Sequence, residues 1–161
     1  MNLDDKGSRM SEKTRGVPPR RHLYVTDANL CTGCRNCELV CSLHHEGKCS
    51  SGLARIHVTK DLFSGDYEPE TCAQCKKAKC LQACPVEGAL TVHKQTGAKI
   101  INVELCTGCR ACEEACIYAK SRSRIKYDAR RNTCLKCDLC NGDPECVKIC
   151  PEKILAYDSP G

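Results

Sequence analysis

The stretch that decides the fold lies at residues 106–116 and reads CTGCRACEEAC. A near copy, CTGCRNCELVC, occupies residues 31–41. In both runs, three cysteines follow one another at two-residue gaps, and a fourth comes after a gap of three. This spacing is typical of chains that bind 4Fe–4S clusters through cysteine thiolates. Gly33 and Gly108, one in each run, are expected to let the backbone pass close to the inorganic core without a Cβ in the way. The two runs therefore predict an iron–sulfur protein.

Two further runs have a wider middle gap of four or five residues, and a proline follows each of them. One run could arise by chance or serve another metal, but four complete runs exclude chance. The first run is Cys31, Cys34, Cys37 and Cys41, and the second is Cys72, Cys75, Cys80 and Cys84, followed by Pro85. The third is Cys106, Cys109, Cys112 and Cys116, and the fourth is Cys137, Cys140, Cys146 and Cys150, followed by Pro151.

The composition agrees with a metal protein. Only 4% of the 161 residues are aromatic, with one Phe and no Trp, so little bulky apolar material is available for a core. Small chains of this kind usually need covalent or metal cross-links, and here the eighteen cysteines must supply them. The formal net charge of +5 counts every thiol as neutral, so it indicates compensation of cluster charge rather than nucleic-acid binding.

A cysteine-rich chain is usually either an intracellular metal protein or a secreted disulfide scaffold, and its cellular compartment distinguishes the two classes. Residues 1–22 contain no apolar stretch that could act as a signal-peptide core, and the sequence after Arg20-Arg21 turns polar too soon for a twin-arginine signal. No apolar run approaches the roughly 20 residues of a membrane span. We expect a cytoplasmic protein without a membrane span.

Pairing of the runs follows from their chemistry. Three cysteines wrap one cluster, while the fourth, placed where the chain enters a helix, points to the neighbouring cluster. Residues 72–116 read as one ordinary two-cluster unit, with strands at 85–92 and 99–103 forming a hairpin. Residues 23–27 and 151–157 resemble the corresponding strands of a second unit that has been cut open.

The predicted fold class is α+β, with two fused bacterial-ferredoxin-like units, one nested inside the other, built from small antiparallel hairpins and short helices. We expect a flexible tail at 1–22, an outer unit at 23–71 plus 117–161, and an inner unit at 72–116. The predicted ligand sets are Cys31, Cys34, Cys37 and Cys150; Cys41, Cys137, Cys140 and Cys146; Cys72, Cys75, Cys80 and Cys116; and Cys84, Cys106, Cys109 and Cys112.

Some alternatives stay open. Each run could close its own cluster, although the direction of the last cysteine disfavours this. Cys134 also forms a C-x2-C-x2-C pattern with Cys137 and Cys140 and could displace a ligand. The cysteine spacing of the second run matches Cys137 onward with one extra residue, which favours Cys134 as a spare thiol. Cys49, in a loop after His44-His45, is expected to be a free thiol.

Outside the runs, residues 42–71 form an insertion with an expected strand at 54–58. The segment 117–133 is basic, which fits either a solvated face or an electrostatic dock for a redox partner. Its cations are Lys120, Arg122, Arg124, Lys126, Arg130 and Arg131. The histidines are expected on the surface or in loops, and they are His22, His44, His45, His57 and His93.

The nested order of the runs resembles the iron–sulfur subunits of the dimethyl sulfoxide reductase and formate hydrogenlyase type. Within that type, CSLHHEG at 41–47, ARIHV at 54–58 and KCDLCNGDPECVKICP at 136–151 are most similar to the electron-transfer subunits of tungsten aldehyde oxidoreductases and related benzoyl-CoA reductases. The resemblance implies a hetero-oligomer with a large tungsten- or molybdenum-pterin subunit. It also implies a flavin/NAD(H) subunit or a soluble ferredoxin as a further partner.

The sequence therefore predicts electron transfer through four 4Fe–4S clusters and no catalysis by the chain itself. A stand-alone polyferredoxin is the alternative, and a zinc-binding interaction module is a weaker one, because zinc sites do not use three cysteines at two-residue gaps. A disulfide scaffold suits such close cysteines poorly. An autonomous enzyme would need an open iron site, yet all sixteen ligands are assigned, and no dinucleotide or phosphate-binding glycine motif occurs.

Overall fold

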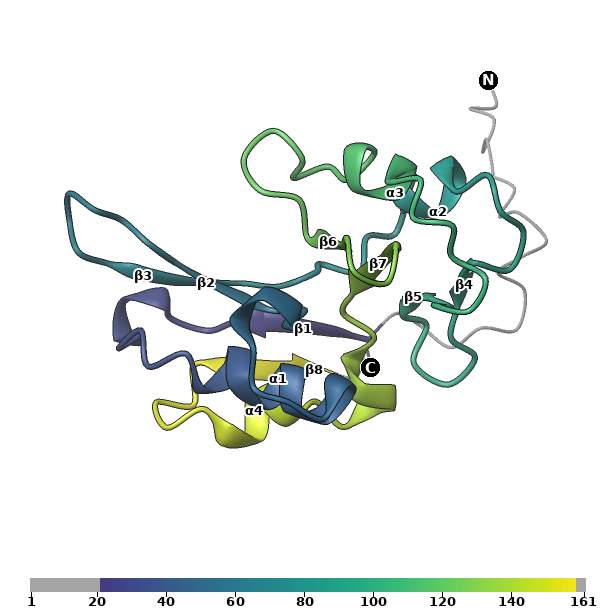
Figure 1. Ribbon diagram of the computed structural model, residues 1–161. Helices are drawn as coiled ribbons and strands as arrows, with labels where there is room; N and C mark the ends of the chain where they lie inside the picture. The colour runs from purple at the N-terminus through teal and green to yellow at the C-terminus, as the bar shows by residue number, and fades with distance from the viewer. Residues whose placement is uncertain (1–20, 159–161) are drawn as a thin grey trace, which may run out of the picture.

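A computed structural model describes residues 21–158 of the chain (Figure 1). Most of the expected tail at 1–22 lies outside these residues. Of that range, Arg21 N donates a 3.0 Å hydrogen bond to Thr96 O, and His22 already begins the first strand. In chain order the elements are β1 His22–Val25, α1 Asn36–Glu46, β2 His57–Lys60, β3 Tyr67–Glu70, α2 Lys79–Ala83, β4 Leu90–Val92, β5 Lys99–Ile101, α3 Ala111–Glu114, β6 Ile125–Asp128, β7 Thr133–Lys136, α4 Glu145–Ile149 and β8 Leu155–Asp158.

Within residues 21–158, the strands form four two-stranded antiparallel sheets. The first strand pairs with the last, and Leu23 lies opposite Tyr157. β4 pairs with β5, and Leu90 lies opposite Ile101, so that the ends of the second run and the start of the third are held together. The short helices and antiparallel hairpins are those of an α+β ferredoxin-like fold.

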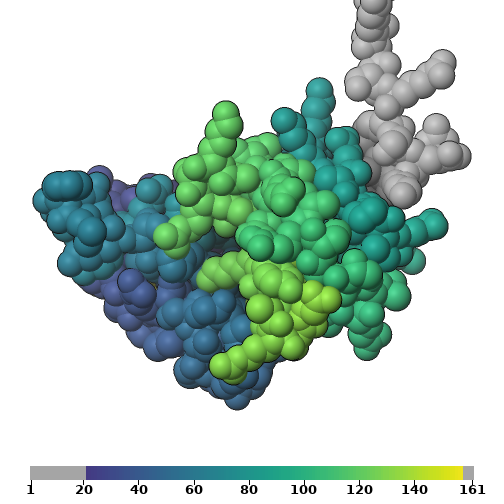
Figure 2. All heavy atoms as spheres, turned by 45° about the horizontal axis from the view of Figure 1, so that its top comes forward, coloured from purple at the N-terminus to yellow at the C-terminus, as the bar shows by residue number. Residues whose placement is uncertain are grey.

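Two hairpins lie outside the ferredoxin pattern, β2–β3 and β6–β7. The strand expected at 54–58 begins only at His57 and continues to Lys60. The reason is a contact with helix α1, because Arg55 N donates a 3.2 Å hydrogen bond to Cys41 Sγ and therefore cannot join a strand ladder. The β2–β3 hairpin projects from the body at the left of Figures 1 and 2, and Leu62 and Phe63 lie in its turn.

The helices begin one turn earlier than predicted. In all four runs the third cysteine is the second residue of a helix, as Cys37 is in α1 and Cys80 is in α2. The prediction that the chain enters a helix at the fourth cysteine is therefore wrong. Cys84 and Cys150 instead cap the C-terminal ends of α2 and α4 in extended conformation.

The apolar core is divided into two clusters, and cysteines belong to both. The larger cluster packs α1 and α4 against β1 and β8, seen together in the lower part of Figure 1, and includes Leu23, Ile56 and Leu155. The smaller one contains Leu90, Cys112, Ile125 and Cys134. Neither contains a buried Phe or Trp, so the thiols themselves occupy core positions.

Candidate metal centres

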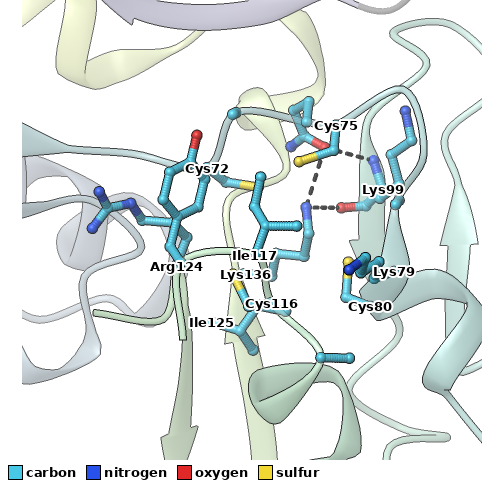
Figure 3. A pocket seen from close by; sticks show the side chains of 15 residues that line it. Cys72, Cys75, Lys79, Cys80, Lys99, Cys116, Ile117, Arg124, Ile125 and Lys136 are labelled. Carbon is cyan, nitrogen blue, oxygen red and sulfur yellow. Dashed lines mark hydrogen bonds between the residues drawn. The ribbon is translucent and has the colours of Figure 1, made fainter. Parts of the chain in front are cut away.

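Cysteines of the second and third runs share one cavity (Figure 3). Cys72, Cys75 and Cys80 line it together with Cys116, the last cysteine of the third run. Three strand residues complete the wall, among them Ile125 and Lys136. The thiols therefore come from two loops that lie more than thirty positions apart along the chain.

The same crossing occurs at two other cavities. The last cysteine of the fourth run, Cys150, lies with the first three cysteines of the first run in a cavity lined by Cys31, Cys34, Cys37 and Cys150. The last cysteine of the second run, Cys84, lies with the first three of the third run in a cavity lined by Cys84, Cys106, Cys109, Cys112 and Cys134.

The remaining thiols surround Cys146 on helix α4. Burial raises the pKa of Cys146, and the neighbouring Cys137, Cys41 and Cys140 raise it further. Burial likewise raises the pKa of Cys140 to about 11, and Cys41 is again among the neighbours that raise it. Cys41 therefore lies among the first three cysteines of the fourth run.

A left-handed backbone residue precedes the second cysteine in every run. Gly33 and Gly108 have φ of 67° and 69°, while Gln74 and Leu139 have φ of 47° and 62°. Alternation of left- and right-handed backbone turns successive N–H groups into a concave anion site, which is one way proteins bind iron–sulfur clusters. The two glycines were singled out from the sequence. The sequence analysis did not identify Gln74 and Leu139, because their position before the second cysteine of a run was the only indication.

Both glycines also sit where a side chain has no room. A Cβ on Gly33 would overlap the ring of Tyr67, which lies on β3. A Cβ on Gly108 would overlap the backbone and side chain of Asn132. Left-handed φ and close approach together explain the glycines of the two CTGC loops.

N–H groups are directed at the cysteine sulfurs, as expected of cluster ligands. Cys134 N lies 3.5 Å from Cys106 Sγ, and hydrogen bonds from Thr133, Cys134 and Gly108 lower the pKa of Cys106 against the effect of burial. The hydroxyl of Thr133 is buried and has no oxygen or nitrogen partner. Crossed thiol sets, concave backbone loops and N–H donors fit anionic 4Fe–4S clusters well.

The two leftover cysteines differ in their surroundings. Cys49 is exposed and lies outside all four thiol sets. Cys134 is 1% exposed, and it lines the cavity of Cys106 and Cys112 rather than joining Cys137 and Cys140. The placement of Cys134 favours the spare-thiol interpretation for the fourth run.

One histidine departs from the expectation of a surface position. The His45 side chain is 9% exposed, its Nε2 lies 3.7 Å from Cys140 Sγ, and its Nδ1 lies 2.6 Å from Arg55 Nη1. Burial and the Arg55 charge lower the pKa of His45 to about 4. The sequence signal was only its place four residues after Cys41 on the same helix.

The basic segment is partly neutralised within the chain. Arg124 and Arg122 pair with Glu70 at 2.7 and 3.5 Å, and Arg131 pairs with Glu46 and Asp128. Figure 2 shows a hollow beside the green part of this segment, where a cavity is lined by residues including Arg55, His57 and Arg122. These ion pairs favour a structural role for much of the segment.

This arrangement defines a ferredoxin-like iron–sulfur protein. Residues 63–159 match the family model described as "4Fe-4S dicluster domain", and the chain belongs to that family. It therefore binds 4Fe–4S clusters. The first run lies before the matched segment.

Several relatives match over most of the chain. The "aliphatic sulfonate oxidoreductase, polyferredoxin-like subunit" of Pyrococcus furiosus is 44% identical over 89% of this chain and 77% of its own. A polysulfide reductase subunit of Wolinella succinogenes is 30% identical over 86% of this chain and 76% of its own. Both relatives are subunits of oxidoreductases, which supports the prediction that such a chain transfers electrons and leaves catalysis to another subunit.

Among solved structures, a protein of the "active site complex BamBC of benzoyl coenzyme A reductase in complex with zinc" has 24% identity and a TM-score of 0.49. The match covers 86% of this chain and 77% of that one. A likeness at that score supports no conclusion about partners. Within residues 21–158, no helix is both long and apolar enough to cross a membrane.

Proposed function

We propose that the chain is the electron-transfer subunit of a multi-subunit oxidoreductase and holds four 4Fe–4S clusters in two nested units. The observation that carries this proposal is the crossing of the runs. Three cavities each combine the first three cysteines of one run with the last cysteine of another. This crossing is what a pair of two-cluster units requires. Of the eighteen cysteines, all but Cys49 and Cys134 take part, which leaves sixteen ligands.

The order of the thiol sets supports a single path through the molecule. Cys80 is among the neighbours that raise the pKa of Cys112, Cys72 acts in the same way on Cys137, and Cys37 acts on Cys146. The set of Cys84 thus adjoins that of Cys72, which adjoins that of Cys41, which adjoins that of Cys31. We infer a linear order of four centres.

Each bound 4Fe–4S cluster supplies one-electron storage. The residues of this chain hold the four centres in sequence and direct N–H groups at cysteine sulfurs, as at Cys41 and Cys106. One electron enters from a reduced donor, and one leaves to an oxidised acceptor, so the chain ends each turnover unchanged.

The partner we propose is a large tungsten- or molybdenum-pterin subunit, with a flavin/NAD(H) subunit or a soluble ferredoxin at the other end of the path. The relatives named as oxidoreductase subunits support a catalytic partner subunit, and its tungsten- or molybdenum-pterin is proposed from the family resemblance. The exposed turn of the β2–β3 hairpin also supports a partner subunit, because Leu62 is 85% exposed there and Phe63 is fully exposed. Large apolar side chains gathered at an exposed tip mark interaction sites. We also propose that the protein is located in the cytoplasm, where cysteine thiols are kept reduced and available as ligands.

Metal analysis of the anaerobically prepared full chain tests the number of clusters. We expect about sixteen iron and about sixteen sulfide per chain, with negligible zinc. A content of about eight iron atoms per chain would contradict the four-cluster proposal. A chain that contained mostly zinc would favour the zinc-binding interaction module. Native mass spectrometry of the chain purified from its host distinguishes a complex containing tungsten or molybdenum from a stand-alone polyferredoxin.

A single substitution tests the nested pairing. Cys150→Ser should perturb the centre of Cys31, Cys34 and Cys37 and leave the two centres of the inner unit spectroscopically unchanged, because Cys150 lines that cavity. The matched control is Cys116→Ser, which should perturb the centre of Cys72 instead. If Cys150→Ser altered only the centre of Cys146, each run would close its own cluster.

A further inference from the structure

A lysine is buried in the wall of the cavity shared by Cys72, Cys75, Cys80 and Cys116. Lys136, the last residue of β7, is 4% exposed. Its Nζ donates hydrogen bonds to Lys99 O at 2.6 Å and to Gln74 Oε1 at 3.1 Å, drawn as dashed lines in Figure 3. Cys137 O accepts a third bond at 3.5 Å. The ammonium group therefore lies between the inner cavity and the first ligand of the fourth run.

Every one of these acceptors is uncharged. Within the described part of the chain, no carboxylate lies at ion-pair distance from Lys136, in contrast to Arg124 on the same cavity, which pairs with Glu70. A buried cation is costly unless an anion compensates it. The anion available here is the thiolate-bound cluster that the cavity would hold, since Lys136 and the four thiols line the same cavity.

The charge of this cavity distinguishes it from the other two. Lys79, Lys99, Arg124 and Lys136 line it, and no Asp or Glu does. The cavity of Cys84 has one cation in its lining, Arg110. The cavity of Cys31 has one cation, Arg35, and one carboxylate, Glu152, in its lining. In the fourth thiol set, the Asp138 carboxylate accepts a 3.0 Å hydrogen bond from Cys140 N and places a negative charge there. Such a difference in the charge of the cavity lining changes the reduction potential of the cluster, because reduction adds one negative charge to it.

We propose that Lys136 is a positioning charge that makes the cluster held by Cys72, Cys75, Cys80 and Cys116 the most easily reduced of the four. Its ammonium stabilises the reduced form more than the oxidised form, and the short distances and low local dielectric strengthen that difference. Because Lys136 adjoins Cys137, the same charge also favours reduction of the next cluster, more weakly. Electrons entering from either end therefore collect at the junction of the two units. This inference rests on the proposed four-cluster function.

Redox titration of the full, cluster-loaded chain, followed by electron paramagnetic resonance, tests the role of the charge. Lys136→Met should lower the reduction potential of one cluster strongly, lower that of one neighbour slightly and leave the other two unchanged. Lys136→Arg keeps the charge and should stay close to the unmodified chain. The matched control is Lys94→Met, which removes a charge from an exposed turn and should shift no potential. Equal shifts in all four clusters, or none, in Lys136→Met with full iron content would overturn the proposal.

A second measurement does not depend on the folding of the Lys136 variants. In the unmodified chain, the first signal to appear on stepwise reduction should be the one that Cys75→Ser alters, since Cys75 lines only this cavity among those described. A first signal unaffected by Cys75→Ser would also overturn the proposal. Iron analysis separates this failure from failure of the proposed function, because a chain with fewer clusters would show less iron in the unmodified protein.

Discussion

Gln74 Nε2 donates a 2.7 Å hydrogen bond to the backbone oxygen of Cys137, 63 positions away in the chain. The same side chain accepts hydrogen bonds from Lys99 N at 2.8 Å and from Lys136 Nζ at 3.1 Å. Gln74 therefore joins the loop of the second run to that of the fourth. These bonds also hold Gln74 in a left-handed conformation, with φ of 47°, that its residue type rarely adopts.

Loss of the Gln74 amide should weaken the junction. Gln74→Met keeps a similar volume but leaves the buried Lys99 N and Lys136 Nζ short of an acceptor, which costs on the order of 2–4 kcal/mol in unfolding free energy. We expect a clearly lower midpoint in anaerobic thermal unfolding of the cluster-loaded chain. Gln82→Met, at an exposed position, is the control and should change little. Equal midpoints for the two variants would show that the junction contributes no stability.

A methyl group at Gly33 should abolish one cluster. Gly33→Ala combines a left-handed φ of 67° with overlap on the Tyr67 ring, so the first CTGC loop must move. Iron analysis should show about four fewer iron atoms per chain. Gly47→Ala is a matched control, because Gly47 has the same φ and no atom within 4 Å of the added carbon. It should lose about 1 kcal/mol and no iron. Full iron in Gly33→Ala would mean that the loop tolerates displacement.

Cys134 should be dispensable for cluster binding. Cys134→Ala removes a buried thiol beside Cys106 and Cys112 without removing a proposed ligand, so the iron and sulfide content should stay unchanged. A modest loss of stability, about 1 kcal/mol, follows from the small void. Cys49→Ala, at an exposed site, should change neither quantity. A loss of about four iron atoms per chain in Cys134→Ala, but not in Cys49→Ala, would show that Cys134 is a cluster ligand.

The clusters should be required for folding. Cysteines occupy both apolar clusters of the core, and neither cluster includes a Phe or Trp. Metal–thiolate bonding therefore has to supply much of the folding free energy. Chelation of iron with oxidative cluster loss should abolish the cooperative thermal transition seen by circular dichroism. An apo chain with a sharp melt would contradict this dependence.

The exposed hairpin turn should matter only for association. Phe63→Ser should leave iron content and thermal midpoint unchanged, because the Phe63 side chain is fully exposed. The affinity for the catalytic partner should fall by at least tenfold if this aromatic ring anchors the interface. Calorimetry with the purified partner would measure it, and Lys94→Ser at another exposed turn is the control. Unchanged affinity would place the docking surface elsewhere.

The four runs determined the chemistry without any structure. The identity of the metal group and the β4–β5 hairpin follow from local spacing and strand pattern. Such features are encoded within short segments, and each run repeats the left-handed residue before its second cysteine. Local patterns also identified Gly33 and Gly108, because a left-handed turn next to a cluster favours glycine.

Tertiary structure decided what short segments do not encode. The late start of β2 follows from the bond between Arg55 N and Cys41 Sγ. The place of Cys134 beside Cys106 follows from the packing of β7 against β5. The uncompensated charge of Lys136 arises only when the loop of Gln74 and strand β5, both distant in the chain, enclose it. In each case a group is buried by segments far away in the chain, and burial, which sets the cost of an unpaired charge or donor, is a property of the assembled fold.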